Sequence, residues 1–254
     1  MKTINLLVIL SILSIVFFSQ PLYSQSVTDG LVAHWKLNDA SGTTVGDSSG
    51  NGHEGTLVGD PQWTDGYFDG ALDFDGTEDE VDIPFHENLN QETFTITAWA
   101  NATTGGTGHR AVVSSRDDFP QRGFIFYATP NNIWQFWTGG GGWNPISGPA
   151  VNLDDWDHLV GTYADGLQRF YVNGEFVGET NATISVNTAQ EFLIGAGANE
   201  TATHNYRFVG KIDDVRVYDR VLDESEIALV MESQVTPVDS LGKIAVTWGQ
   251  LKAK

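Results

Sequence analysis

The sequence predicts an all-β fold, a two-sheet antiparallel jelly-roll sandwich with one short C-terminal helix. Three observations support it: short stretches of alternating or aromatic residues, turn dipeptides between them, and 28 glycines among 254 residues. Many short strands separated by glycine-containing turns are typical of β-sandwiches. The 41% hydrophobic content supplies enough apolar side chains for a core. We therefore predict one domain over residues 27–233.

Four segments carry the clearest strand patterns. Residues 94–98 alternate apolar and polar side chains, as a strand with one buried face does. Residues 123–127 and 133–137 are short aromatic stretches bounded by Gly, Pro or Asn, and we expect them to be neighbouring strands. Within residues 169–177, Asn173-Gly174 predicts a two-residue hairpin turn, since both residue types tolerate positive φ.

A single helix is predicted near residues 223–231. Asp223 is a suitable N-cap, and Glu226 follows it at the position that completes a capping box. Ile227, Val230 and Met231 then give the helix an apolar stripe. We expect this helix to cover an edge or an end of the sandwich.

The two ends of the chain predict segments outside the domain. Residues 1–26 have the features of a signal peptide, with Lys2 before an apolar stretch and a small-residue cleavage pattern at 24–26. The apolar stretch is shorter than the about 20 residues of a membrane span, although an uncleaved anchor is the alternative. We expect a secreted or cell-surface protein without a membrane span after leader cleavage. Residues 234–254 are predicted to be a C-terminal tail, either a disordered chain end or a sorting tag.

Charge and cysteine content exclude several functions. The chain has 33 acidic against 13 basic residues, a formal charge of -20, which disfavours binding to nucleic acids and to anionic membranes. It has no cysteine, which excludes disulfides, thiolate nucleophiles and Cys-ligated metal centres.

Several sequence blocks occur in a fixed order along the domain: residues 30–39, 47–55, 71–76, 81–84, 94–99, 156–163, 171–174 and 210–218. Together they resemble the bacterial laminin-G-like, concanavalin A-like jelly-roll domains of secreted proteins. The resemblance implies the sandwich fold and a binding module for glycans or proteins. It also implies a structural calcium ion, which members of that family often carry.

The loop at residues 47–52 is the candidate calcium site. Asp47 and Asn51 offer oxygen ligands on a glycine-containing backbone, which suits a hard cation. Asp213 shares strand parity with Val215 and Val217, so we expect it to face the core and to need a partner. The predicted ligands are therefore Asp47, Asn51 and Asp213. The alternative is that Asp47 and Asn51 form Asx turns while Asp213 accepts hydrogen bonds from turn amides.

Aromatic residues around the glycines at 139–142 form the candidate ligand site. Parity puts Trp134 and Phe136 on one face of their strand and Trp137 on the other, and the first face is expected to be core. Trp143 is expected to lie in a loop with Gly and Pro, and it is the preferred exposed platform. Flat aromatic faces favour the C–H side of sugar rings.

Basic residues near this cluster supply polar partners. His109, Arg110 and Arg116 are expected on the loops that precede the aromatic strands, and their side chains can bind hydroxyl or carboxylate groups. We predict ligand binding by Trp143, Arg116, Trp137, His109 and Arg110. The concentration of Arg110, Arg116 and Arg122 would suit an acidic glycan.

The predicted function is that of a secreted, non-catalytic, carbohydrate-binding module, with an extracellular glycan or surface protein as partner. The alternative is a surface structural or adhesion protein that binds other proteins. A concanavalin A-like glycoside hydrolase or lyase is disfavoured. Residues 78–82 resemble the laminarinase pattern, in which Glu, Asp and Glu occupy positions i, i+2 and i+5. The match fails, because this chain has Glu78, Glu80 and Ile83 at these positions.

Overall fold

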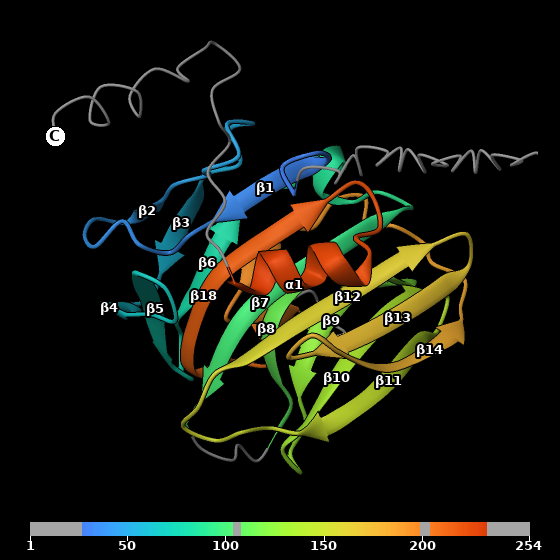
Figure 1. The fold of residues 1–254 in the computed structure, drawn as a ribbon. Helices are drawn as coiled ribbons and strands as arrows, with labels where there is room; N and C mark the ends of the chain where they lie inside the picture. The colour runs from blue at the N-terminus through green and yellow to red at the C-terminus, as the bar shows by residue number, and fades with distance from the viewer. Residues whose placement is uncertain (1–26, 104–107, 199–203, 233–254) are drawn as a thin grey trace, which may run out of the picture.

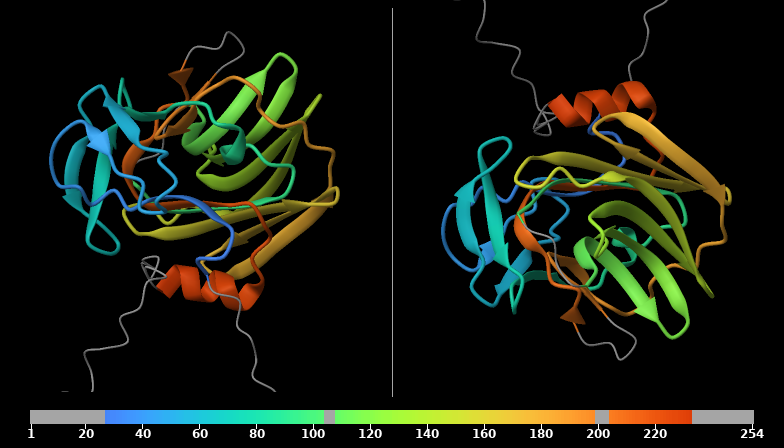
Figure 2. Two further views of the ribbon diagram at one scale, coloured as in Figure 1. Left: turned by 90° about the horizontal axis from the view of Figure 1, so that it is seen from above. Right: turned by 90° about the horizontal axis from the view of Figure 1, so that it is seen from below.

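Two antiparallel β-sheets pack face to face in the computed structural model, which describes residues 27–103, 108–198 and 204–232 (Figures 1 and 2). The predicted signal peptide, 1–26, and the predicted tail, 234–254, lie outside the described residues. The elements are β1 (Leu31–Trp35), β2 (Thr44–Val45), β3 (Gly55–Val58), β4 (Gln62–Asp65), β5 (Gly70–Asp75), β6 (Glu80–Ile83), a 3-10 turn η1 (Glu87–Leu89), β7 (Phe94–Ala102), β8 (Arg110–Asp118), β9 (Gln121–Ala128), β10 (Ile133–Gly140), β11 (Trp143–Ala150), β12 (Asp157–Ala164), β13 (Leu167–Val172), β14 (Glu175–Asn181), β15 (Phe192–Ile194), β16 (Gly197–Ala198), β17 (His204–Asn205), β18 (Val209–Tyr218) and α1 (Glu224–Glu232).

The first sheet, here called sheet A, has the order β14-β13-β12-β7-β18-β5-β4, and β1 also pairs with β18. The second, sheet B, has the order β11-β10-β9-β8-β15-β6-β3-β2. Strands β16 and β17 form a separate short pair. The predicted jelly-roll sandwich is therefore confirmed.

The core lies between the inner faces of the two sheets. Phe94 and Ile96 of β7 contribute from sheet A, and Phe126 of β9 contributes from sheet B. Trp134 and Phe136 of β10 are fully buried in this core, as their parity predicts. Burial of such side chains is worth about 1.5–3 kcal/mol each, so the paired aromatic strands are a main source of stability.

The hairpin between β13 and β14 has the predicted turn. Asn173 and Gly174 both have positive φ, 53° and 78°. This combination defines a turn whose twist matches that of the two strands. The side chain of Asn173 also accepts a hydrogen bond from the backbone N–H of His158 at 2.8 Å, which fastens the turn to β12.

Helix α1 forms where the sequence predicts it, and its cap is the predicted capping box. The Glu226 N–H donates to the Asp223 carboxylate, and the Asp223 N–H donates to the Glu226 carboxylate, both at 2.9 Å. The expected position at an edge or end was wrong. The helix lies across the outer face of sheet A (Figures 1 and 2), where Ile227 and Val230 pack on a cluster that includes Val160 and Tyr218. An amphipathic helix buries more apolar surface on a sheet face than at an edge.

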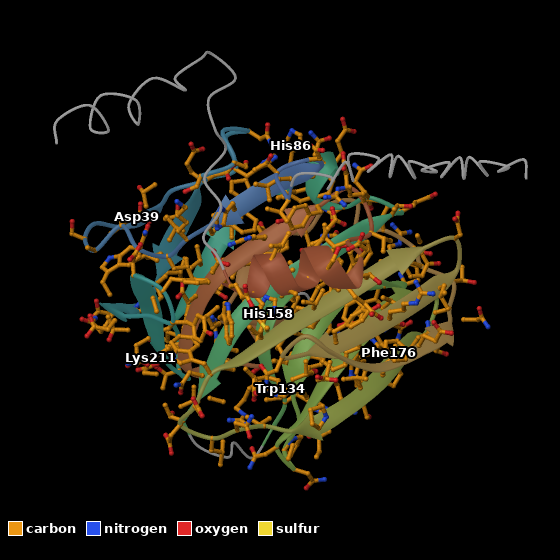
Figure 3. All side chains as sticks on the ribbon, in the orientation of Figure 1. Asp39, His86, Trp134, His158, Phe176 and Lys211 are labelled. Atoms are coloured by element: carbon orange, nitrogen blue, oxygen red, sulfur yellow. The ribbon has the colours of Figure 1, made fainter. Side chains whose placement is uncertain are left out.

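A charged network is buried on the same outer face of sheet A. The Asp214 carboxylate accepts a hydrogen bond from His34 Nε2 at 2.6 Å and forms an ion pair with Arg216 at 2.8 Å. All three side chains are at most 1% exposed. Burial alone would raise the pKa of Asp214, but Arg216 and His34 hold it below the ordinary value. Burial lowers the pKa of the neighbouring His158, labelled in Figure 3, to about 3, so that residue is neutral at pH 7.

No helix among the residues described, 27–103, 108–198 and 204–232, has the length and apolar character needed to cross a membrane.

The buried network gives a stability prediction. Asp214→Asn keeps the side-chain shape but leaves the Arg216 charge buried without its counter-ion, so we expect a loss of about 3–5 kcal/mol in the free energy of unfolding. Urea denaturation of both proteins at pH 7 measures it. Glu179→Gln is the matched control, because it breaks the exposed Arg169–Glu179 pair and is expected to cost at most about 1 kcal/mol. Equal losses in the two variants would contradict the prediction.

Candidate functional site

The outer face of sheet B carries an aromatic pocket with a volume of ≈ 220 Å³. Its lining residues come from four strands and two neighbouring loops: His109, Arg116, Tyr127, Trp137, Trp143 and Tyr206. The rings of Trp137 and Trp143 lie side by side on β10 and β11, with centroids 6.1 Å apart. Their β-strand alternation turns them away from the core that Trp134 and Phe136 fill. We call these six residues the aromatic pocket.

Arg116 is the buried residue that contacts most of the side chains around the pocket. Its guanidinium carbon lies 4.8 Å from the ring centroid of Trp143 and 5.4 Å from that of Tyr206, within the range of cation–π contacts. Its NH1 donates to the Tyr127 hydroxyl at 2.6 Å, and its NH2 is bonded to the Asp118 carboxylate. The guanidinium therefore touches three of the surrounding aromatic side chains and one carboxylate.

Asp118 links the arginine to the indole of Trp143. One of its oxygens binds Arg116, and the other accepts a hydrogen bond from Trp143 Nε1 at 3.2 Å. Trp137 is held in a comparable way, since its Nε1 donates to Gln135 Oε1 at 2.9 Å. Both indole rings thus have fixed orientations, which lowers the entropy cost of placing a ligand against them.

Burial shifts the pKa values of two other pocket residues, His109 and Tyr127. It lowers the pKa of His109, so the imidazole is neutral at pH 7. It raises the pKa of the Tyr127 phenol, which is therefore protonated. Neutral imidazole and phenol groups can both donate and accept hydrogen bonds.

The structure brings together most of the predicted ligand residues. Trp143, Trp137, Arg116 and His109 all line the aromatic pocket. Arg110 does not: its side chain is buried, and NH2 donates to Asn132 Oδ1 at 2.6 Å. The expected loop positions of Trp143 and Arg116 were wrong, because these residues belong to the paired strands β11 and β8.

Sequence reasoning missed Tyr127 and Tyr206. The alternation within 123–127 gives a signal for Tyr127, because Ile125 and Tyr127 share the outer face. Tyr206 lies far along the chain, and no local pattern points to it.

Two of the predicted calcium ligands hold a loop against β1. The Asp47 carboxylate accepts hydrogen bonds from the N–H groups of His34, Ser49 and His53 at 2.9–3.0 Å and from the Ser49 hydroxyl. Partial burial would raise the pKa of Asp47, but these hydrogen bonds hold it below the ordinary value. Asn51 directs its amide NH₂ to the Val32 carbonyl at 2.8 Å.

Asp213 is buried, but a β-bulge places it on the outer face of sheet A. Ile212 and Val215 both lie in the core although they are three positions apart, because the register shifts at Asp214, which has φ of 50°. The parity argument for an inward Asp213 was therefore wrong. Its Oδ2 accepts a hydrogen bond from the N–H of Phe68 at 2.9 Å, and burial raises its pKa to about 7.

These contacts do not gather the three residues into one ligand set. Asp47 and Asn51 belong to a loop that is hydrogen-bonded to β1, whereas Asp213 lies under the turn that precedes β5. Amide hydrogen bonds occupy both oxygens of Asp47 and one of Asp213, as the alternative of Asx and turn contacts describes. Calcium binding stays a prediction of the sequence.

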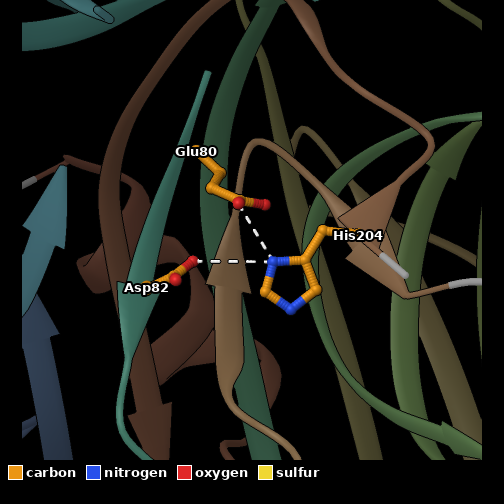
Figure 4. A group of neighbouring side chains, drawn as sticks. All are labelled: Glu80, Asp82 and His204. Carbon is orange, nitrogen blue, oxygen red and sulfur yellow. Dashed lines mark hydrogen bonds and ion pairs between the residues drawn. The ribbon is translucent and has the colours of Figure 1, made fainter. Parts of the chain in front are cut away.

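A second titratable cluster joins β6 to β17. Glu80, Asp82 and His204 place one ligand atom each within 4.8 Å of one another (Figure 4). His204 Nδ1 lies 3.0 Å from Glu80 Oε1 and 3.9 Å from Asp82 Oδ1. Carboxylate and imidazole are ligands that transition metals accept. Arg207 lies 2.6 Å from Glu80 Oε2 and places a positive charge beside the same carboxylate.

A comparison with protein-family models identifies the fold family. Residues 75–228 match the model of the concanavalin A-like lectin/glucanases superfamily. The chain belongs to this superfamily. The family resemblance drawn from the sequence blocks is thereby confirmed. No curated protein matches the chain significantly.

Several solved structures resemble this superfamily member in fold at low sequence identity. The binding domain of Paraclostridial Mosquitocidal Protein 1 has a TM-score of 0.67 at 15% identity, over 81% of this chain and 52% of that chain. Domain 4 of AbnA, an extracellular arabinanase from Geobacillus stearothermophilus, was solved with arabinotriose and has a TM-score of 0.61 at 19% identity, over 79% and 98%. The binding domain of Botulinum Neurotoxin DC, solved with SialylT, has a TM-score of 0.64 at 14% identity, over 82% and 52%. The chain thus spans about half the length of the two toxin domains, and identities this low establish the fold alone.

The His204 cluster gives a pH prediction. The hydrogen bond to Glu80 raises the pKa of His204 above 6.5, so its contribution to stability is complete below pH 6.5 and is lost as pH rises through the raised value. His204→Gln should therefore reduce the free energy of unfolding more at pH 5.5 than at pH 9, as measured by urea denaturation.

NMR titration of the imidazoles supplies the internal control. The charges facing His204 are those of Glu80, Asp82, Glu191 and Arg207. His204 should titrate above its ordinary value and His109, which burial affects in the opposite direction, below it. A His204 value at or below 6.5 would contradict the cluster geometry.

Proposed function

We propose that this chain is a non-catalytic carbohydrate-binding module whose binding site is the aromatic pocket. The observation that carries the proposal is the pair of indoles, Trp137 and Trp143, held at the surface of sheet B by hydrogen bonds to Gln135 and Asp118. Immobilised aromatic faces flanked by polar groups suit sugars, which have apolar C–H faces and hydroxyl edges.

The similar structures support a binding function. The toxin domains are binding domains by name, and the arabinanase domain was solved with an oligosaccharide. Fold similarity does not transfer a ligand, so the proposal rests on the pocket and uses the neighbours as background.

The carboxylates near the two candidate sites favour binding over hydrolysis. Asp118 is bonded to Arg116 and Trp143, and Glu80 is paired with Arg207 and His204. A glycoside hydrolase needs one carboxyl group that can donate a proton and a second that can attack or activate water. Asp118 and Glu80 each already contact an arginine, so neither carboxylate is placed to act on a sugar as this reaction requires.

The proposed partner is an extracellular glycan. The signal-peptide pattern of residues 1–26 supports export, and the charge of -20 suits an exported, soluble domain that does not bind nucleic acid. An exported module of this kind would attach a cell or a larger assembly to a polysaccharide.

Trp143→Ala tests the proposal. The truncation removes one ring of the pocket and should weaken glycan binding at least about tenfold, because a central aromatic residue of a binding surface is worth about 2 kcal/mol or more. The measurement is a glycan-array screen of the wild type, followed by calorimetric titration of both proteins with the best-retained glycan.

Phe176→Ala is the matched control. Phe176, labelled in Figure 3, is a 50% exposed aromatic residue on β14 of the opposite sheet. Its removal should leave the affinity unchanged, and both variants should keep the wild-type melting temperature within a few degrees. Unaltered affinity in Trp143→Ala, or no retention of any glycan by the wild type, would overturn the proposal.

A further inference from the structure

We infer that the aromatic pocket selects uncharged sugars, and that Arg116 is a positioning residue for its rings and not a receptor for acidic groups. The inference rests on the proposed function and names its ligand class. It differs from the expectation, drawn from the three neighbouring arginines, of an acidic glycan.

The charge of Arg116 is already compensated. Its side chain is 4% exposed, and its NH2 forms a buried ion pair with Asp118. Its NH1 donates to the Tyr127 hydroxyl, and its planar face is covered by the rings of Trp143 and Tyr206. A ligand carboxylate that took the place of Asp118 on Arg116 would leave a buried charge whose remaining partner is Trp143 Nε1.

The neighbouring basic residues do not supply a replacement charge. Arg110 is buried with its guanidinium on the Asn132 side chain, and Arg122 donates to the Thr188 hydroxyl outside the pocket lining. His109 is neutral at pH 7 because burial lowers its pKa.

The surrounding field also disfavours anions. The whole chain carries a formal charge of -20. A net negative potential reduces the local concentration of acidic ligands and slows their association, most strongly at low salt. An uncharged sugar escapes both the repulsion and the cost of desolvating a carboxylate.

The remaining contacts fit a neutral ring. The exposed parts of Trp137, Trp143 and Tyr206 offer apolar and aromatic surface, and His109 adds a neutral hydrogen-bonding group. The volume of ≈ 220 Å³ is below the range of pockets for drug-sized ligands, so we assign it to a single sugar ring of a longer chain.

The test compares glycans that differ only in charge. The probes are polygalacturonate and its fully methyl-esterified form, together with array glycans printed with and without terminal sialic acid. Calorimetric titration at 25 mM and 300 mM NaCl gives the affinities for the wild type. We expect each neutral probe that binds to be preferred at least about tenfold over its acidic partner at low salt, with neutral binding changing less than twofold between the two salt concentrations.

The outcomes separate the two claims. Preference for the acidic partner, with affinity that falls as salt rises, would overturn this inference and leave the binding function in place. Retention of no sugar on the array or in titration would overturn the proposed function and this inference with it.

Arg116→Lys tests the positioning role. Lysine keeps the positive charge but lacks the planar fork that contacts Tyr127, Asp118 and two rings at once. We expect weaker binding of the neutral probes and a changed tryptophan emission spectrum, with the neutral-to-acidic affinity ratio unaltered. A ratio that moves toward the acidic or the neutral probe more than about threefold would show that Arg116 reads ligand charge.

Discussion

The arrangement of sheet A depends on the Asp214 carboxylate, which is buried between His34 and Arg216. β18 is the strand that pairs with β1, β5 and β7, and the register shift at Asp214 lies in its middle. A buried carboxylate is tolerated only with compensating donors and charge, so Asp214 requires β1 and β18 to stay in this alignment. The same bulge turns Asp213 outward, where the turn before β5 covers it.

Charge burial also shapes the aromatic pocket, with a different result. The Arg116–Asp118 pair on sheet B lies directly beneath rings that remain partly exposed. Because Asp118 compensates the charge of Arg116, the guanidinium does not serve as an ionic partner for a ligand, and it instead contacts the rings of Trp143 and Tyr206. The pairing of Arg116 with Asp118 therefore leaves the pocket with aromatic surface and neutral hydrogen-bonding groups for a ligand.

Features with local causes were predictable from the sequence, and those that depend on distant partners were not. Strand alternation, the Asn173-Gly174 turn and the Asp223 cap follow from the residues themselves, and they form as expected. Strand parity failed at Asp213, because a bulge adds one residue that no local pattern announces. The sequence does not distinguish Arg110 from Arg116. In the fold, Arg110 donates a hydrogen bond to Asn132, whereas Arg116 lines the aromatic pocket. The pairing of Glu80 with His204 spans 124 positions and forms only because the fold brings β17 close to β6.

The two outer faces of the sandwich explain why the binding site lies on sheet B. Helix α1 packs on Val160, Tyr171 and Tyr218, so this part of the outer face of sheet A is buried by the chain itself. On sheet B, the corresponding aromatic residues Trp137 and Trp143 are only partly buried and are oriented by polar partners at their Nε1 atoms. In the free protein, the exposed parts of the two indoles are in contact with water, which is unfavourable for apolar surface. Binding of a ligand with an apolar face removes this surface from water and lowers the free energy. The charges beneath the indoles are already paired, so a charged ligand would find no free counter-ion there. A ligand with an apolar face and no charge therefore gains the most free energy from covering the indoles, and a neutral sugar ring is such a ligand.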